Sequence, residues 1–187
     1  MANEWVSSRE YAEIARSWHH WKLHAAGFRF SAEKLYEHMP FDEYGTSEDV
    51  RIHCVLMYQF LIGLSLECLL KGLIISAAPD LVVDKLAKPE SESLHTYALD
   101  ARLQTHDLTA LAGVTLGSNY NLAFSREERD LLRRLSNIIK WHGRYPLALT
   151  SERQSSLYFR PVGDRVTFEG LWERLLAVLD GATEKRA

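Results

Sequence analysis

The stretch of sequence that decides the fold is EDVRIHCVLMYQFLIGLSLECLLKGLIISA, residues 48–77. Apolar side chains cover almost every face of the helix that this stretch would form, so we expect it at the centre of a helical bundle. Its most apolar part, residues 52–66, has 15 residues, fewer than the ~18–20 that a helix needs to cross a bilayer. The sequence therefore predicts a buried core helix and no association with a membrane.

A long amphipathic pattern precedes this helix. Between Tyr11 and Met39, apolar residues recur every three or four positions, which predicts one helix of about 30 residues that ends before Pro40. We expect this helix to pack antiparallel to residues 48–77. We also expect it to bury its largest side chains, namely Trp18, Trp21, Phe28 and Leu35.

The middle of the chain predicts shorter elements. Residues 81–86 read as one short helical piece within a polar, irregular segment, and a short helix then starts at Thr105, which would cap it. Ser125 and Glu128 have the spacing of a capping box, which begins the next helix, and Gly143 ends that helix.

The C-terminal part predicts a small hairpin and a last helix. Residues 157–168 alternate between apolar and polar around a turn-like centre, which is typical of a hairpin, and residues 168–182 carry the apolar face of a helix. The predicted fold class is therefore all-α, with five or six helices in a single domain, residues 1–187, and this hairpin before the last helix.

Composition and charge exclude several classes of protein. The 187 residues carry a net charge of −3, which excludes a strongly basic protein that coats nucleic acid but leaves room for a local basic face. Cys54 and Cys68 lie on one predicted helix with a rise of ~21 Å between them, too far apart for a disulfide. The first residues, MANEW, do not have the pattern of a signal peptide, and we expect a reduced, cytoplasmic protein.

One segment is locally basic. Residues 131–151 contain four basic side chains and no acidic one. The basic residues are Arg133, Arg134, Lys140 and Arg144. Trp141 and Tyr145 are interleaved with them and could stack on bases, so RNA or a nucleotide is one interpretation of the segment, which rests mainly on a resemblance to a known family. The alternative is that the cations complement the dipole of a helix C-terminus while the aromatic residues belong to the core.

Two further groups of polar residues are candidates for a structural or a functional role. Glu67 and Lys71 have i, i+4 spacing in the most apolar helix, which predicts a structural ion pair, with a role in a cleft as the alternative. His106 and Asp107 are expected at a helix N-terminus, where a carboxylate is favoured, with a role at the site as the alternative.

No metal or cofactor site is expected. His20 and His24 have a spacing that can hold a metal, but no acidic residue is adjacent, so they are interpreted as surface histidines. The sequence has no phosphate-binding loop, dinucleotide-binding fingerprint, nucleophile elbow or zinc-knuckle spacing.

Four pieces of the chain, in this order, resemble the HEPN superfamily of small helical domains from bacterial toxin–antitoxin and phage-defence systems. They are the long first helix, SLECLLKGLI at 65–74, THDL at 105–108 and WHGRYP at 141–146. The resemblance covers residues 9–146 and leaves 147–187 as a C-terminal extension. It implies a helical bundle, a homodimer that acts on RNA, and an antitoxin or nucleotidyltransferase-like partner.

The resemblance also implies a catalytic site. Ribonuclease members of the family cut RNA without metal and carry an Arg, four to six residues and then a His. Here His142 is the candidate acid or base, Arg144 and Arg134 are candidate phosphate ligands, and Asn137 resembles the polar residue that often follows the family's Arg. Seven residues separate Arg134 from His142, however, and Ser136 stands at an expected Arg position. The alternative is a non-catalytic dimerisation or partner-binding domain with a degenerate site.

Overall fold

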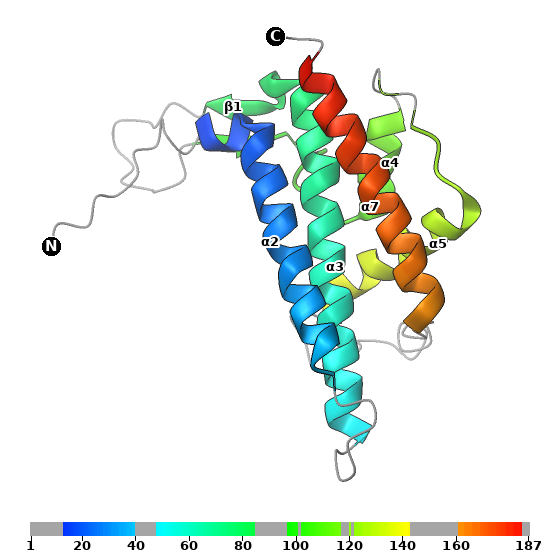
Figure 1. The fold of residues 1–187 in the computed structure, drawn as a ribbon. Coiled ribbons are helices and arrows are strands. Elements are labelled where there is room, and N and C mark those ends of the chain that lie inside the picture. Colours follow the sequence, from blue (N-terminus) through cyan, green and yellow to red (C-terminus); the bar gives the residue numbers. More distant parts are fainter. Residues whose placement is uncertain are drawn as a thin grey trace, which may run out of the picture.

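The computed structural model is helical over most of the chain that it describes. The described residues are 13–39, 48–84, 97–100, 102–116, 120, 122–142 and 161–184. In Figure 1, α3 (Glu48–Ala77) runs through the middle, α2 (Trp18–Glu37) lies antiparallel beside it, and α7 (Pro161–Glu184) packs on the other side. The all-α bundle predicted from the sequence is confirmed.

The burial of α3 confirms its prediction as the core helix. Its fully buried side chains include Leu66, Leu69, Leu70, Leu73 and Ile75. Residues 52–77 are nevertheless long enough to cross a membrane, and their most apolar 18-residue window, with a mean hydropathy of 1.9, is apolar enough, by those two criteria alone. The expectation that this segment is too short is therefore wrong. Its burial gives the physical reason for its composition, because 78% of its most apolar stretch is covered by the rest of the protein.

Helix α2 lies at the edge of the bundle, and this corrects the prediction that its largest side chains are buried. All four are only partly buried: Trp18, Trp21, Phe28 and Leu35. The fully buried positions of α2 are Ala25 and Ala32. A Cβ at Gly72 of α3 would lie 3.2 Å from the Cβ of Trp21, so the two helices approach closely there. The absence of a side chain at Gly72 permits this approach.

The predicted first helix is interrupted near its start. Residues 13–16 are helical, but Ser17 has an extended backbone and forms the N-cap position of α2. The indole N–H of Trp21 donates to the carbonyl of Ala15 at 2.9 Å, which holds the preceding turn against α2.

A short strand occupies residues 82–84 of the helical piece predicted at residues 81–86, and residues 85 and 86 lie outside the described residues. After α3, η1 (Pro79–Leu81) makes a 3-10 turn. The next residues form β1 (Val82–Asp84), which pairs antiparallel with β2 (Tyr97–Leu99). The two β-branched valines of β1 favour an extended backbone, which is the physical reason for the difference.

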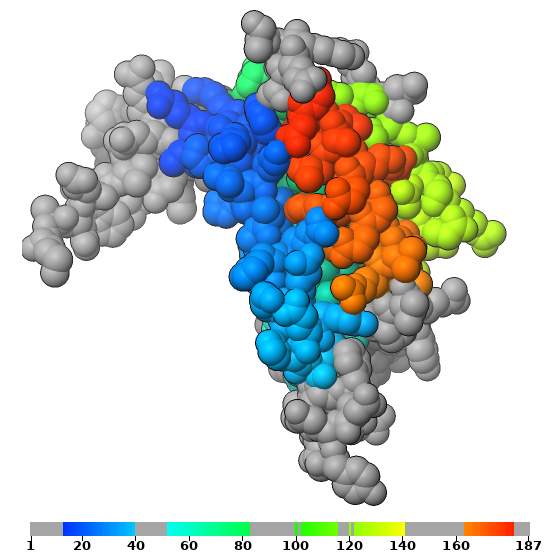
Figure 2. All heavy atoms as spheres, viewed as in Figure 1, coloured from blue at the N-terminus to red at the C-terminus, as the bar shows by residue number. Residues whose placement is uncertain are grey.

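Helix α7 occupies part of the predicted hairpin. Residues 161–168 are helical. The helix starts at Pro161, and the N–H that proline lacks would have no partner within the helix in the first turn anyway. Residues 157–160 lie outside the described residues. The core-facing residues of α7 are Phe168, Leu171, Trp172, Leu175 and Leu179. Figure 2 shows α2 and α7 side by side, where Arg29 of α2 lies 2.7 Å from Glu169 of α7. The last helix thus belongs to the common core.

The remaining helices pack on α3 and on one another. Helix α4 (Leu108–Leu116) precedes α5 (Arg126–Asn137), which continues as a π-helix, η2 (Ile138–His142). The predicted capping box is confirmed: the N–H of Glu128 donates to Ser125 Oγ at 3.2 Å, and the N–H of Ser125 donates to the Glu128 carboxylate at 2.7 Å.

Two helical glycines allow a matched test of this packing. A Cβ at Gly63 of α3 would lie 2.8 Å from Cδ1 of Ile139, whereas a Cβ at Gly27 of α2 would meet nothing within 4 Å. Gly27→Ala is expected to raise the free energy of unfolding by about 1 kcal/mol, the usual difference in helix propensity. Gly63→Ala should lose that gain, because Ile139 must shift. Urea unfolding measures both, and equal gains would contradict the close contact of α3 with η2.

Candidate functional site

A charged cluster lies where α3 meets the segment before α4. Lys71 Nζ donates to Glu67 Oε1 at 2.6 Å, and both side chains are only 7% exposed. Nδ1 of His106 lies 2.9 Å from Glu67 Oε2, and the His106 side chain is 38% exposed. The predicted ion pair is confirmed, and the Glu67 carboxylate connects a buried lysine to a histidine near the surface.

The next residue, Asp107, caps α4. Its Oδ1 accepts the N–H groups of Thr109 and Ala110 at 3.0 and 3.1 Å. The prediction that Thr105 is the cap is wrong: Thr105 Oγ1 instead accepts the N–H of Asp107 at 2.9 Å. Asp107 is the better cap because its carboxylate reaches two N–H groups and its charge suits the helix N-terminus.

The same segment is fastened to the helix that carries His142. Lys140 Nζ in η2 donates to Asp107 Oδ2 at 2.7 Å. The N–H of Leu108 donates to Ser136 Oγ in α5 at 2.9 Å. Ser136, at the position where the family resemblance places an Arg, therefore serves to join α4 to α5.

These contacts also set the ionisation of Asp107. Burial disfavours the charged carboxylate, but the hydrogen bonds from Lys140 and from the start of α4 outweigh burial and lower the pKa of Asp107 to about 2. An unfolded Asp has a pKa of about 3.9. The stabilisation from Asp107 is therefore complete above that value and is lost as the pH falls through the lower, folded-state pKa.

We expect this difference to appear in acid unfolding. The free energy of unfolding of the protein should exceed that of Asp107→Asn above pH ~4, and the gap should narrow as the pH approaches ~2. Denaturant titrations of both proteins at several pH values measure the gap. A gap that stays constant or widens on acidification would contradict the role given to Lys140.

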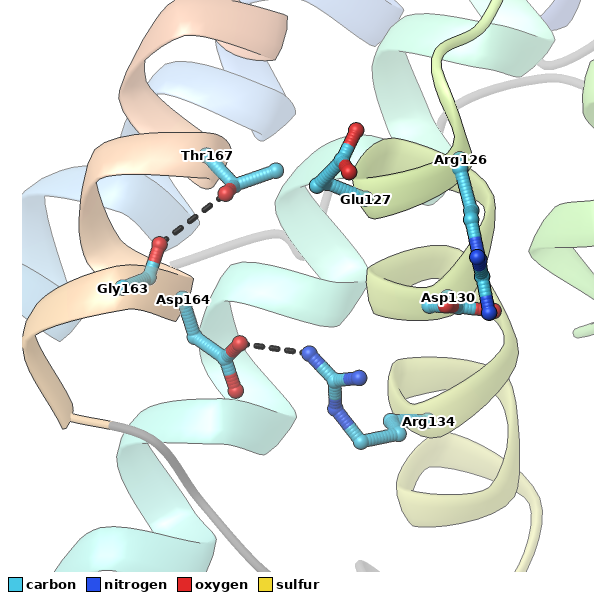
Figure 3. A pocket seen from close by; sticks show the side chains of 7 residues that line it. All are labelled: Arg126, Glu127, Asp130, Arg134, Gly163, Asp164 and Thr167. Atoms are coloured by element: carbon cyan, nitrogen blue, oxygen red, sulfur yellow. Dashed lines mark hydrogen bonds and ion pairs between the residues drawn. The ribbon is translucent and has the colours of Figure 1, made fainter.

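A pocket of about 400 Å³ lies between α5 and α7. Figure 3 shows Arg134 reaching from α5 to Asp164 in the first turn of α7, with 2.5 Å between Nη2 and Oδ1. Nε of Arg134 is buried and has no hydrogen-bond partner within the described part of the chain. The lining also includes Arg126, Glu127 and Asp130. With three carboxylates and two guanidinium groups, this pocket does not favour an anion.

The basic segment of the sequence is largely neutralised in the folded protein. Arg133, which is exposed, lies 2.7 Å from Asp130 in the same helix. Arg134 forms an ion pair with Asp164, and Lys140 forms one with Asp107. The positive charge predicted for residues 131–151 is therefore distributed among ion pairs, as far as its described side chains go.

The other predicted site residues are described only in part. Residues 141 and 142 belong to η2, but the side chains of Trp141 and His142 lie outside what the structure describes, as do Arg144 and Tyr145 altogether. Asn137 is half-buried at the end of α5.

Two adjoining hollows of about 340 and 520 Å³ follow the outer side of α2. They share His20, His24 and Phe28, and Cys68 lines the smaller one. Burial, together with the nearby Glu67, raises the pKa of Cys68 to about 12, so this thiol is a poor nucleophile at neutral pH. Among the residues that the structure describes, no three His, Cys, Asp or Glu side chains gather closely enough to hold a metal.

The cations of the basic segment are evident in the sequence, whereas their acidic partners are not. Asp107 and Asp164 neutralise side chains 33 and 30 residues away, and no local pattern indicates such a pairing. The link from Glu67 to His106 spans 39 residues, although both residues were candidates from their sequence context. Comparisons of the chain with protein-family models, curated proteins and solved structures give no match.

Proposed function

We propose that this chain is a HEPN-like cytoplasmic protein of a toxin–antitoxin or defence system that binds RNA and cleaves it without a metal ion. One observation carries the proposal. Lys140, two residues before His142, contacts Asp107, and the adjacent His106 contacts the buried Glu67. Two of the sequence pieces that resemble the family, residues 65–74 and 105–108, thus meet, and the second also contacts Lys140, the residue directly before the piece at 141–146.

The chemistry of these residue types suits RNA cleavage by its own 2′-hydroxyl. Such cleavage needs a base for the hydroxyl proton and cations for the charge that develops on phosphorus. In the proposal His142 is the base and Arg144 binds the phosphate. Arg134, already held by Asp164, contributes less to phosphate binding than the sequence suggests. Trp141 and Tyr145 provide stacking surfaces for bases.

A second candidate function has its own supporting observation. Ser136, at an expected Arg position, is buried and joins two helices: its Oγ donates to the carbonyl of Leu132 at 2.7 Å and accepts the N–H of Leu108 at 2.9 Å. Because the side chain at position 136 joins two helices and does not provide a cation for phosphate, the second candidate is a HEPN-like domain that binds RNA or a protein partner without cutting.

The experiment that separates these functions uses the full chain and end-labelled RNA in EDTA. Cleavage by the wild type supports the nuclease. Salt-dependent binding without cleavage supports the second function. If the protein neither cuts nor binds RNA, the RNA proposal is wrong, and a dimerising partner-binding domain remains.

We also expect a homodimer, with an antitoxin or nucleotidyltransferase-like protein as a further partner. Besides the resemblance, Leu23 and Phe30 of α2 are exposed apolar side chains that a second copy could cover. Light scattering should give about twice the chain mass of 21.5 kDa. A mass equal to that of one chain over a wide concentration range would contradict the dimer.

A further inference from the structure

We infer that the pocket between α5 and α7 binds a guanine base. The inference rests on the proposed function, because the guanine is taken to belong to single-stranded RNA, and it deepens that function by naming the base that is recognised. Proteins recognise single-stranded RNA largely through bases that leave the stack and form hydrogen bonds along their edges. The volume of the pocket, about 400 Å³, lies in the range of small-molecule sites.

The first support is a carboxylate that has no cation beside it. Of the three carboxylates in the pocket, Asp164 pairs with Arg134 at 2.5 Å. Asp130 pairs with Arg133 at 2.7 Å. Within the described residues no cation forms an ion pair with the third carboxylate, Glu127. The pocket therefore keeps one carboxylate that can accept hydrogen bonds from a ligand.

Glu127 is also in the right state to accept them. Its own N–H and the hydroxyl of Ser125 lower the pKa of this carboxyl below its usual value, so it is ionised at neutral pH. The Ser125 hydroxyl donates to Oε2 at 2.9 Å, and a carboxylate has about four acceptor sites, so both oxygens can accept further hydrogen bonds. In Figure 3 the Glu127 side chain reaches from the first turn of α5 toward Thr167 of α7, across the pocket.

The second support is a set of donors in the same pocket. Arg126 precedes Glu127 in the first turn of α5, is exposed, and has no ion-pair partner among the described residues. Nε of Arg134 is buried without an acceptor in that part of the chain, although Asp164 holds the end of the same guanidinium. A buried donor without a protein acceptor is uncommon, and water or a ligand commonly supplies the acceptor.

Guanine is the base whose edges match these groups. It has donors on two neighbouring nitrogen atoms, N1 and N2, which one carboxylate can accept together, and two neighbouring acceptors, O6 and N7, which one guanidinium can contact together. Adenine, cytosine and uracil have no such pair of donors. A base is also neutral, so it can enter a pocket whose charges do not favour a phosphate. We assign Glu127 to N1 and N2, and Arg126 to O6 and N7.

The test measures binding of RNA in which every 2′-hydroxyl is methylated, so that the full chain can bind this RNA but cannot cleave it. Short oligouridine strands carry one guanine, adenine, hypoxanthine or 7-deazaguanine, and fluorescence anisotropy in EDTA gives the dissociation constant of each. Hypoxanthine lacks the N2 amino group, and 7-deazaguanine lacks N7. We expect guanine to be bound about 5- to 150-fold more tightly than adenine, the usual discrimination by one good bidentate contact.

Two variants test the assignment of the contacts. In Glu127→Gln, the change from guanine to hypoxanthine should no longer weaken binding, whereas the change to 7-deazaguanine still should. Arg126→Ala should show the reverse. Glu37→Gln changes an exposed carboxylate at the end of α2 and should keep the full preference for guanine. Circular dichroism verifies that each variant is folded, and the series of bases on the wild type tests the preference without any variant.

The outcomes separate this inference from the proposed function. If the wild type binds RNA with guanine and with adenine equally, or if both variants respond to the two modified bases as the wild type does, the guanine site is wrong while RNA binding stands. If no RNA binds, the RNA proposal is wrong, and guanosine alone then tests the pocket. A melting temperature that rises with guanosine but not with adenosine, and that does not rise in Glu127→Gln, would assign the pocket to a free guanine nucleoside or nucleotide. No response to guanosine would mean that both proposals are wrong.

Discussion

Replacing Glu67 with alanine is expected to lower the free energy of unfolding by about 3–5 kcal/mol, because Lys71 would keep its charge in the core without a counter-charge. Both side chains are 7% exposed, so water cannot take the place of the missing carboxylate. The effect should appear as a shift of the urea midpoint with little change in slope.

Two further variants show whether charge burial is the cause. Glu67→Leu combined with Lys71→Met removes both charges and fills a similar volume, so most of the lost stability should return. Lys34 and Glu37 form a matched pair on the surface, with the same 2.6 Å separation and with both side chains about half exposed. Glu37→Ala should leave the midpoint nearly unchanged, since exposed ion pairs contribute little. A small effect of Glu67→Ala, or no recovery in the double variant, would contradict the buried charge.

The parts of the fold that the sequence predicts well depend on residues close together in the chain. The capping box of Ser125 and Glu128 lies within four residues, and its hydrogen bonds form as the spacing predicts. The burial of α3 follows from apolar residues on all its faces. Both are local properties, so they depend little on what packs around them.

The incorrect predictions concern residues whose structure depends on distant partners. The alternation around residue 165 resembles a hairpin, yet α7 forms there because Phe168 enters the core and Asp164 meets Arg134. Similarly, Asp107 rather than Thr105 caps α4, in a segment that Lys140 and Ser136 hold in place.

The candidate site was predictable by residue type more than by arrangement. Glu67 and Lys71 stand out as charges in an apolar helix and His106 and Asp107 as residues of a helix N-terminus, so the sequence predicts structural roles for all four, with a role at the site as the alternative. Which of them meet depends on how α3, α4 and η2 pack, and the sequence contains no repeat or motif that fixes this packing. The ion pairs of the basic segment could not be predicted for the same reason, because their acidic partners are distant in the sequence.

The largest effect on activity is expected at His142. If the protein is a ribonuclease, His142→Ala should lower the cleavage rate by ~10²–10⁴-fold, because no other group would take the 2′-hydroxyl proton at that position. Cleavage by the wild type should persist in EDTA. The helical content and melting temperature of His142→Ala should match the wild type, which circular dichroism measures in the same preparations.

The structure gives this prediction a control that the sequence does not offer. Ser136 lies in the preceding helix, and its side chain has a structural role. Ser136→Ala removes the hydrogen bonds to Leu108 and Leu132, so it should lower the free energy of unfolding by about 1–3 kcal/mol. The cleavage rate of the folded Ser136→Ala protein should nevertheless stay much closer to wild type than that of His142→Ala. Equal loss of activity in the two variants would mean that the cleavage rate follows the integrity of the helix end. Unchanged cleavage in His142→Ala would remove the catalytic assignment. A low rate in His142→Ala alone, at wild-type stability, is the result that assigns proton transfer to this residue.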